Sequence, residues 1–116
     1  MDMYDDIGVK KYVDVDAGLG RVRGNKKLFE RMLSLFLQSG ELASLENAIA
    51  ENRIGDAANI AHAIKGMTGN LALTPLFEIS SQLMNELRAG AYSDTTYAEY
   101  KLVYAATREQ VDRLVN

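Results

Sequence analysis

Residues 57–71 read AANIAHAIKGMTGNL, and this stretch has the spacing of an amphipathic helix. The apolar residues at positions 57, 60, 61, 64, 67 and 71 fall on one face when each residue turns the helix by about 100°. His62 falls almost opposite that face, and Gly66 and Gly69 share its stripe, with Lys65 beside them. The sequence therefore predicts a helix that buries its aliphatic face and turns an imidazole toward solvent.

The two glycines on the outward stripe indicate that this face of the helix has a functional role. Each glycine inside a helix costs roughly 1 kcal/mol relative to alanine, so a helix that only had to fold gains nothing from two. A lone histidine is often a buried structural residue, but the apolar periodicity places His62 on the other face. An exposed histidine without a role is also common, but the company of Lys65, Gly66 and Gly69 favours a functional one.

The N-terminal part of the chain predicts an arm and a short helix. Residues 1–15 mix charged and apolar side chains and are expected to form an irregular arm. A helix is predicted over residues 17–23, with Asp16 as its N-cap and Gly24 closing it.

A long helix is predicted next, with Asn25 as its N-cap. Two apolar rows repeat every seven residues from Leu28 and Phe29, and their phase continues through Gly40. One helix, bent at Gly40, is therefore expected to reach about Asn52.

Three further helix boundaries follow from capping signals. Asp56 is expected to cap the histidine helix, which runs to about Ala72. Thr74 is expected to cap the following helix, which ends at Gly90, and Ser93 begins the last one. No alternation typical of strands is visible.

The predicted fold class is all-α. Four amphipathic helices with short connections pack most simply as an antiparallel four-helix bundle, with the short N-terminal helix and arm packed across one end. Residues 1–116 are expected to form a single domain, in which residues 1–24 are the arm and short helix and residues 25–116 are the bundle.

The amino-acid composition limits which classes of partner and which cellular compartment are expected. A formal charge of −3 over 116 residues disfavours nucleic acid and anionic membranes as partners. The absence of cysteine excludes disulfides and thiolate chemistry. No apolar run approaches the ~18 residues of a membrane span, and the first residues are acidic where a signal peptide is basic. A cytoplasmic location is expected.

The chemistry open to one exposed histidine is limited. Metal binding is disfavoured because the chain has no second histidine and no cysteine. A hydrolytic triad would need a pocket and an oxyanion hole, which an exposed bundle face does not offer. Imidazole acting as a nucleophile fits better, because it can take a phosphoryl group on nitrogen and release it again. Lys65 would then neutralise phosphoryl oxygens during transfer.

The string from His62 to Leu73 resembles the signature of histidine-containing phosphotransfer (Hpt) domains, which act in multistep phosphorelays. His62, Lys65 and Gly66 match that pattern in place, and Thr68 stands at its small-residue position. The similarity extends over residues 13–90, roughly, and includes the Leu- and Phe-rich segment before the histidine helix.

The resemblance implies a four-helix bundle whose histidine is phosphorylated on Nε2 and docks to receiver domains of response regulators or hybrid sensor kinases. It implies that Lys65 assists the transfer and that Gly66 leaves room for the partner. On the same interpretation, Asn59, Gly69 and Asn70 are expected to contact the docked partner.

Two positions depart from the family pattern. The family often has glycine ten residues after the histidine, where this chain has Ala72. Many members also place a glutamine 22 residues after the histidine to orient its ring, and here that residue is Met84. The second ring nitrogen would then lack its usual partner, unless Gln82, Asn85 or water replaces it.

The leading hypothesis is a monomeric phosphocarrier in two-component signalling that relays a phosphoryl group through His62 between receiver aspartates. No kinase activity of its own and no cofactor in this chain are expected, and the Mg²⁺ used in transfer should sit in the partner's receiver domain. One alternative is a docking or scaffold domain that binds receivers without transfer. Another is the detached phosphoacceptor domain of a chemotaxis-type kinase, for which an ATP-binding kinase domain would be the donor.

Overall fold

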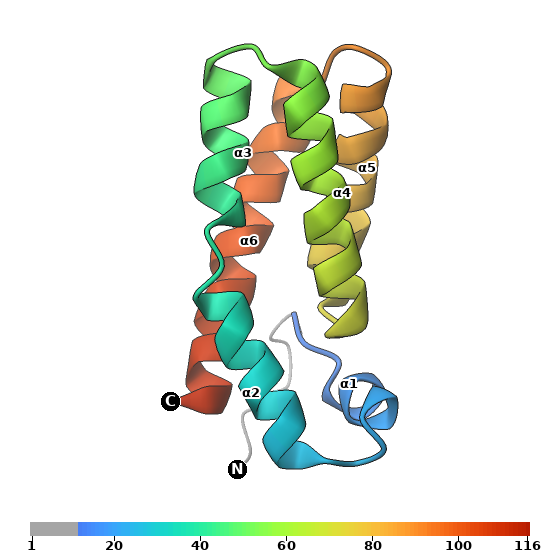
Figure 1. Ribbon diagram of the computed structural model, residues 1–116, viewed down its shortest axis with the longest axis vertical. Helices are drawn as coiled ribbons and strands as arrows, with labels where there is room; N and C mark the ends of the chain where they lie inside the picture. Colours follow the sequence, from blue (N-terminus) through green and yellow to red (C-terminus); the bar gives the residue numbers. More distant parts are fainter. Residues whose placement is uncertain (1–11) are drawn as a thin grey trace.

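The computed structural model describes residues 12–116, and in this part of the chain all regular structure is helical. The helices are α1 (Val15–Arg21), α2 (Lys26–Leu37), α3 (Glu41–Ala50), α4 (Ile54–Asn70), α5 (Thr74–Arg88) and α6 (Asp94–Val115). The helices α3, α4, α5 and α6 run alternately up and down, while α2 packs along the lower part of α6 (Figure 1). The prediction of an all-α antiparallel bundle is confirmed.

The helix α1 lies below the connection between α4 and α5, at one end of the bundle (Figure 1). This is where the short N-terminal helix was expected. The predicted arm is described only from residue 12 onward, and residues 1–11 lie outside the described part of the chain. No helix in residues 12–116 combines the length and the apolar character that crossing a membrane requires.

The prediction of one long helix through Gly40 is wrong, because the chain leaves the helix between α2 and α3. The guanidinium of Arg108 on α6 donates to the carbonyl oxygen of Leu37 at 2.8 Å, and the Ser39 hydroxyl accepts from the backbone N–H of Glu41 at 3.2 Å. These two side chains satisfy backbone groups that a continuous helix would have paired internally. The break is therefore stabilised by a contact with a distant helix.

The break also changes which residues face the core. Phe29 and Phe36 of α2 are buried, as their row predicted. Ala43 continues the same row but is exposed, whereas Leu45 of α3 is fully buried. The buried residues of α3 therefore do not continue the heptad row that is buried in α2. A single bent helix would keep the same row buried on both sides of Gly40.

The start of α1 differs from its prediction. The cap is Asp14 and not Asp16, since a carboxylate oxygen of Asp14 accepts from the backbone N–H of Ala17 at 3.1 Å. The helix consequently begins at Val15. The backbone N–H of Asp14 also donates to the carbonyl oxygen of Ala72 at 2.9 Å, so a contact distant in sequence fixes where the chain enters α1.

The predicted caps of α4 and α5 are each displaced. Asp56 lies inside the first turn of α4, where its carboxylate pairs with Arg53 at 2.9 Å, and the helix starts at Ile54 without a side-chain cap. Thr74 is the first residue of α5, and Leu73 occupies the cap position. An acidic residue in the first turn still favours the helix through its dipole, so Asp56 supports α4 without capping it.

Other predicted boundaries are confirmed. The side chain of Asn25 accepts from the backbone N–H of Leu28 at 3.1 Å and begins α2. Ser93 caps α6, and Gly90 follows α5 with a φ of 99°, a conformation that glycine adopts without strain. Glu86 holds this corner by accepting from the backbone N–H of Ser93 at 2.7 Å and from the Thr96 hydroxyl at 2.7 Å. These hydrogen bonds lower the pKa of the Glu86 carboxyl.

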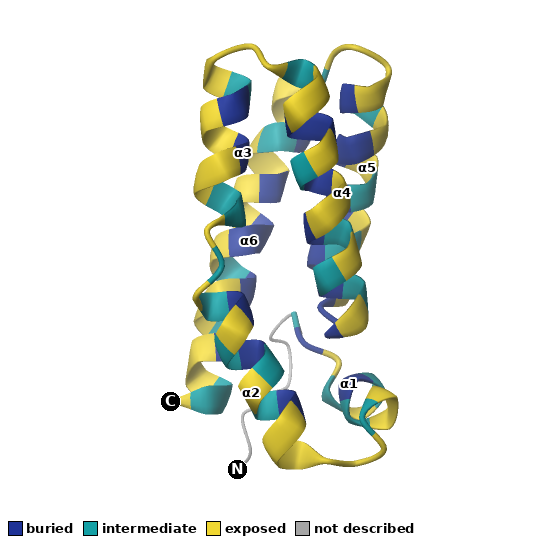
Figure 2. Cartoon of the chain, in the orientation of Figure 1, coloured by how far each residue is buried: buried dark blue, intermediate teal, exposed yellow. Residues whose placement is uncertain are grey.

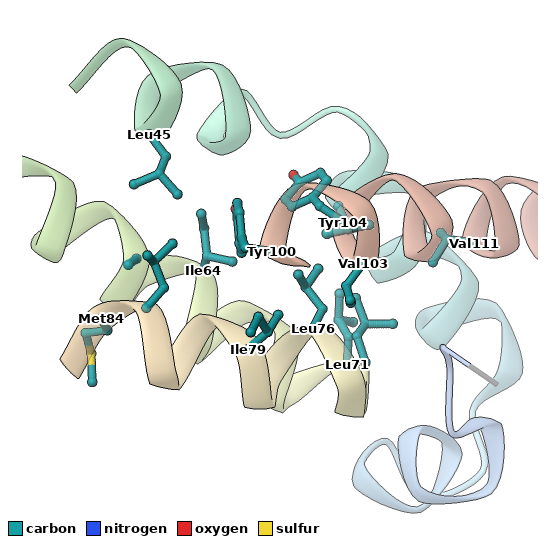
Figure 3. Packing of buried hydrophobic residues seen from close by; sticks show 14 of the residues in the cluster. Leu45, Ile64, Leu71, Leu76, Ile79, Met84, Tyr100, Val103, Tyr104 and Val111 are labelled. Carbon is teal, nitrogen blue, oxygen red and sulfur yellow. The ribbon is translucent and has the colours of Figure 1, made fainter. Parts of the chain in front are cut away.

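The core lies between α3, α4, α5 and α6, and Figure 2 shows the buried residues facing one another across it. Ile64 and Tyr100 point into this core together with aliphatic residues of α5 (Figure 3). Tyr100 and Tyr104 are almost completely buried, and burial raises the pKa of both phenols. These tyrosines are core residues.

The histidine helix is anchored by two neighbouring helices. Its most extensive packing partner is α5, and it also packs against α3. Ala57 and Ala61 are fully buried, and such small side chains let neighbouring helices approach closely. The result is a helix fixed along its inner face, with its outer face available.

Candidate functional site

His62 lies near the middle of α4 and is exposed to solvent. Its neighbours at helical spacing on the inner side, Ala61 and Ile64, have no exposed surface. The imidazole therefore stands on the outward face, as the periodicity predicted. A side chain in this position is reached from solvent without any rearrangement of the core.

An open groove of about 470 Å³ lies beside His62. It is lined by Arg21, His62, Lys65, Gly66, Thr68, Gly69, Asn70, Ala72, Thr74 and Phe77. These lining residues include two cationic side chains and no carboxylate, although the whole chain carries a formal charge of −3. The groove is therefore a positively charged part of an acidic protein, and it favours an anionic group next to the imidazole.

Lys65 is held beside the groove by an aromatic ring. Its ammonium nitrogen lies 5.9 Å from the centroid of the Phe77 ring, within the range of a cation–π contact. Lys65 is half-buried and follows His62 by one helical turn. The ammonium thus has a preferred place over the Phe77 ring, beside the groove that His62 also lines.

The two glycines of the outward stripe have different surroundings. A Cβ added to Gly69 would lie 3.2 Å from the Phe77 ring, so this position is small because α5 packs against it. A Cβ added to Gly66 would meet nothing within 4 Å. Packing within the described part of the chain therefore explains Gly69 and leaves Gly66 without an internal reason.

The two asparagines expected at the docking face lie at different distances from the groove. Asn70 is the last residue of α4 and lines the groove. Asn59 is exposed one turn before His62 and is not among the lining residues. The structure thus gathers His62, Lys65 and Asn70 with the glycines and leaves Asn59 beyond the groove.

The sequence interpretation missed two arginines near the site. Arg21 of α1 donates to the carbonyl oxygen of Gly69, which brings a second cation to the groove. Arg88, the last residue of α5, places a guanidinium nitrogen 3.5 Å from Nδ1 of His62. Neither arginine belongs to the local pattern around His62, so helical spacing could not indicate them.

The two departures from the family pattern now have structural explanations. Ala72 has a φ of 56°, a left-handed conformation that favours glycine, which accounts for the glycine common at this position. Met84 is buried and Gln82 donates to Glu86 and Thr96, so neither residue serves the imidazole. Arg88 is the α5 side chain that reaches the ring.

This arrangement is suited to nucleophilic chemistry on an anionic group. The imidazole is exposed, Lys65 is near it, and the adjacent groove is open. Within residues 12–116, no three His, Cys, Asp or Glu side chains gather in a way that could hold a metal ion. An exposed imidazole beside an open cationic groove can act as a nucleophile toward an anionic group.

Comparison with known proteins identifies one family. The family model described as Hpt domain matches residues 31–116, which include most of α2 and all of α3, α4, α5 and α6. Neither the curated proteins nor the solved structures contain a match to this chain. The matched segment includes His62, Lys65 and Gly66, while α1 with Arg21 lies before it.

Proposed function

Because this chain belongs to the Hpt domain family, whose members carry out histidine phosphotransfer in phosphorelays, we propose that His62 is its phosphoacceptor. The protein accepts a phosphoryl group from the aspartyl phosphate of one receiver domain and passes it to the aspartate of another. The observation that carries this proposal is the exposed imidazole of His62 beside an open, cationic groove.

The transfer needs one nucleophilic displacement in each direction. The lone pair of Nε2 attacks phosphorus, the N–P bond forms, and the bond from phosphorus to the aspartyl oxygen breaks, its electron pair leaving on the carboxylate. In the tautomer that reacts, the ring proton is on Nδ1. In the second transfer a carboxylate oxygen of the other receiver attacks phosphorus, and the N–P electron pair returns to Nε2.

The cations near His62 support a charge-stabilising role. A transferring phosphoryl group carries negative charge on its outer oxygens, and a nearby cation lowers the energy of that charge. Lys65 supplies an ammonium one turn from the imidazole, held in place by Phe77. We assign Lys65 this role in the transfer.

The partner is proposed to be a receiver domain of a response regulator or of a hybrid sensor kinase. Such a domain brings an acidic phosphorylation site, with its Mg²⁺, to the cationic groove. Gly66 presents bare backbone at the point of approach, since nothing in the described chain lies within 4 Å of its would-be Cβ. Gly69, Asn70 and Asn59 extend this docking face along α4. We further propose that the protein acts as a monomer in the cytoplasm, without kinase activity of its own.

The decisive experiment is transfer of radiolabelled phosphate from a phosphorylated receiver domain. Wild-type protein is expected to take up label that is stable to alkali and labile to acid, as for a phosphoramidate. His62→Gln should take up none, and Lys65→Met should be slowed by about tenfold, the effect of losing roughly 1.4 kcal/mol of charge stabilisation. Arg113→Met, which removes a cation on α6 and not at the site, serves as the matched control and should behave as wild type.

Three results would redirect the proposal. Equal labelling of wild type and His62→Gln would remove His62 from the mechanism. Binding of the receiver without label transfer would favour a docking domain. Label arriving from an ATP-dependent kinase domain and not from receivers would favour the phosphoacceptor domain of a chemotaxis-type kinase.

A further inference from the structure

Arg88 is the residue that contacts the second nitrogen of the His62 ring. Its guanidinium Nη2 lies 3.5 Å from Nδ1, and both side chains are exposed. Arg88 ends α5, which packs antiparallel against α4, so the guanidinium reaches the ring from the neighbouring helix (Figure 1). Lys65, by contrast, belongs to α4 itself and leans toward Phe77.

The chemistry of a guanidinium determines what this contact can be. Arginine has five N–H donors and no acceptor, and it stays charged. A neutral imidazole has one N–H and one lone pair, and the hydrogen bond made by one nitrogen decides which tautomer is present. If Arg88 donates to Nδ1, the lone pair is on Nδ1 and the proton is on Nε2.

We propose that Arg88 is a positioning residue that holds the ring of unphosphorylated His62 in the Nε2–H tautomer. The usual family arrangement places an amide at this nitrogen, and an amide can accept from Nδ1–H. Here that position is the buried Met84, and a donor-only side chain from one turn later replaces the amide. Arg88 therefore stabilises the opposite tautomer to the one that an accepting partner would stabilise.

The consequence for transfer rests on the proposed function. Attack by Nε2 requires its lone pair, so the Nε2 proton must pass to water and a proton must add to Nδ1 before the N–P bond forms. The Nδ1–H that results cannot donate to a guanidinium, since both groups are donors. Arg88 must leave the ring before or during phosphorylation, and the contact belongs to the resting protein only.

The test is ¹⁵N NMR of the imidazole in the free protein. His62 is the only histidine of the chain, so its two ring nitrogens give unambiguous signals that report the tautomer. Spectra of the full-length protein are compared in alkaline buffer, where imidazole is neutral. The variants are Arg88→Met, which removes the donor, Arg88→Lys, which keeps one, and Arg88→Glu, which can only accept. Arg113→Met is the control for lost charge.

In Arg88→Met we expect the ratio of Nδ1–H to Nε2–H to rise about two- to fivefold, the change produced by losing a hydrogen bond worth up to ~1 kcal/mol. Arg88→Glu should raise it further. Arg88→Lys and Arg113→Met should stay close to wild type. An unchanged ratio in Arg88→Met and Arg88→Glu would overturn the proposal, and so would an equal rise in Arg113→Met.

This measurement is independent of phosphotransfer. If the tautomer responds to Arg88 but receivers deliver no label to His62, the proposed function fails and the role of Arg88 in holding the ring stands. If label is transferred and the tautomer ratio is the same with and without Arg88, the proposed function stands and the role of Arg88 in holding the ring fails.

Discussion

The residues on the inner face of α4 are explained by packing, whereas His62 and Gly66 on its outer face are not. On the inner face Ala57, Ile64 and Thr68 have no exposed surface, and each fits a requirement of packing. The buried Thr68 hydroxyl, for example, donates to the carbonyl oxygen of Ile64 at 2.8 Å, which satisfies it within the helix. On the outer face His62 and Gly66 are exposed, and no packing contact within residues 12–116 explains either of them.

The glycines make this difference measurable. Gly69 is needed because the Phe77 ring would lie 3.2 Å from its Cβ, whereas Gly66 faces open space. A mid-helix glycine without an internal reason lowers stability relative to alanine. The inner face is thus explained by folding, and docking of a partner is the explanation that we propose for Gly66 on the outer face.

The largest expected effect comes from the inner face. Ile64→Ala should lower the free energy of unfolding by about 2 to 5 kcal/mol, because it leaves a cavity beside Tyr100 in the core. His62→Ala, two residues earlier, should change it by less than about 0.5 kcal/mol, because the side chain is exposed. Denaturant titration of both variants measures the two changes in the free energy of unfolding. Equal losses would mean that the imidazole supports the fold, and the comparison of faces would fail.

A smaller effect of opposite sign is expected at the glycines. Gly66→Ala should raise the free energy of unfolding by up to about 1 kcal/mol, since alanine favours the helix and its methyl group meets nothing. The same variant should accept phosphate more slowly from a receiver, because the methyl group obstructs docking. Gly69→Ala should gain less stability, because Phe77 must shift to accommodate it.

Denaturation and single-turnover labelling of the two glycine variants provide the test. A Gly66→Ala protein that is more stable and transfers at the wild-type rate would show that the outer face does not require a glycine there. A larger gain at Gly69 than at Gly66 would contradict the contacts that separate the two positions.

The smallest effect is expected where the inner face ends. Ala72 follows α4 with a φ of 56°, which costs a residue with a side chain about 1 to 2 kcal/mol. Ala72→Gly relieves this strain but increases the conformational entropy of the unfolded chain. The net gain in the free energy of unfolding should be about 0.5 kcal/mol. Ala58→Gly, buried within α4, is the matched control and should lose about 1 kcal/mol. Thermal unfolding of Ala72→Gly and Ala58→Gly tests whether the backbone conformation of the replaced alanine decides if glycine raises or lowers the free energy of unfolding.

The inferences from sequence that succeeded were those that depend on one helix at a time. The exposure of His62 and the burial of Ile64 follow from spacing along α4 alone. Gly90 ends α5 and Ser93 caps α6 for equally local reasons. The domain limits and the roles assigned to the site residues stay predictions.

Two of the inferences that failed involve contacts between elements. The break after Leu37 is stabilised by Arg108, and the start of α1 is fixed by the hydrogen bond from Asp14 to Ala72. In each case the partner lies dozens of residues away. Heptad rows and capping preferences are properties of neighbouring residues, so they carry no information about such partners.

The amino-acid sequence by itself determined an amphipathic histidine helix in an all-α chain, because side-chain spacing alone decides which face of a helix avoids water. Only the tertiary structure decided what surrounds the imidazole. Arg88 and Arg21 reach the outer face of α4 from other helices, across 26 and 48 residues of chain from their hydrogen-bond partners. The register in which helices pack, and the reach of side chains across that packing, set such contacts, and neither is a property of any local stretch of sequence.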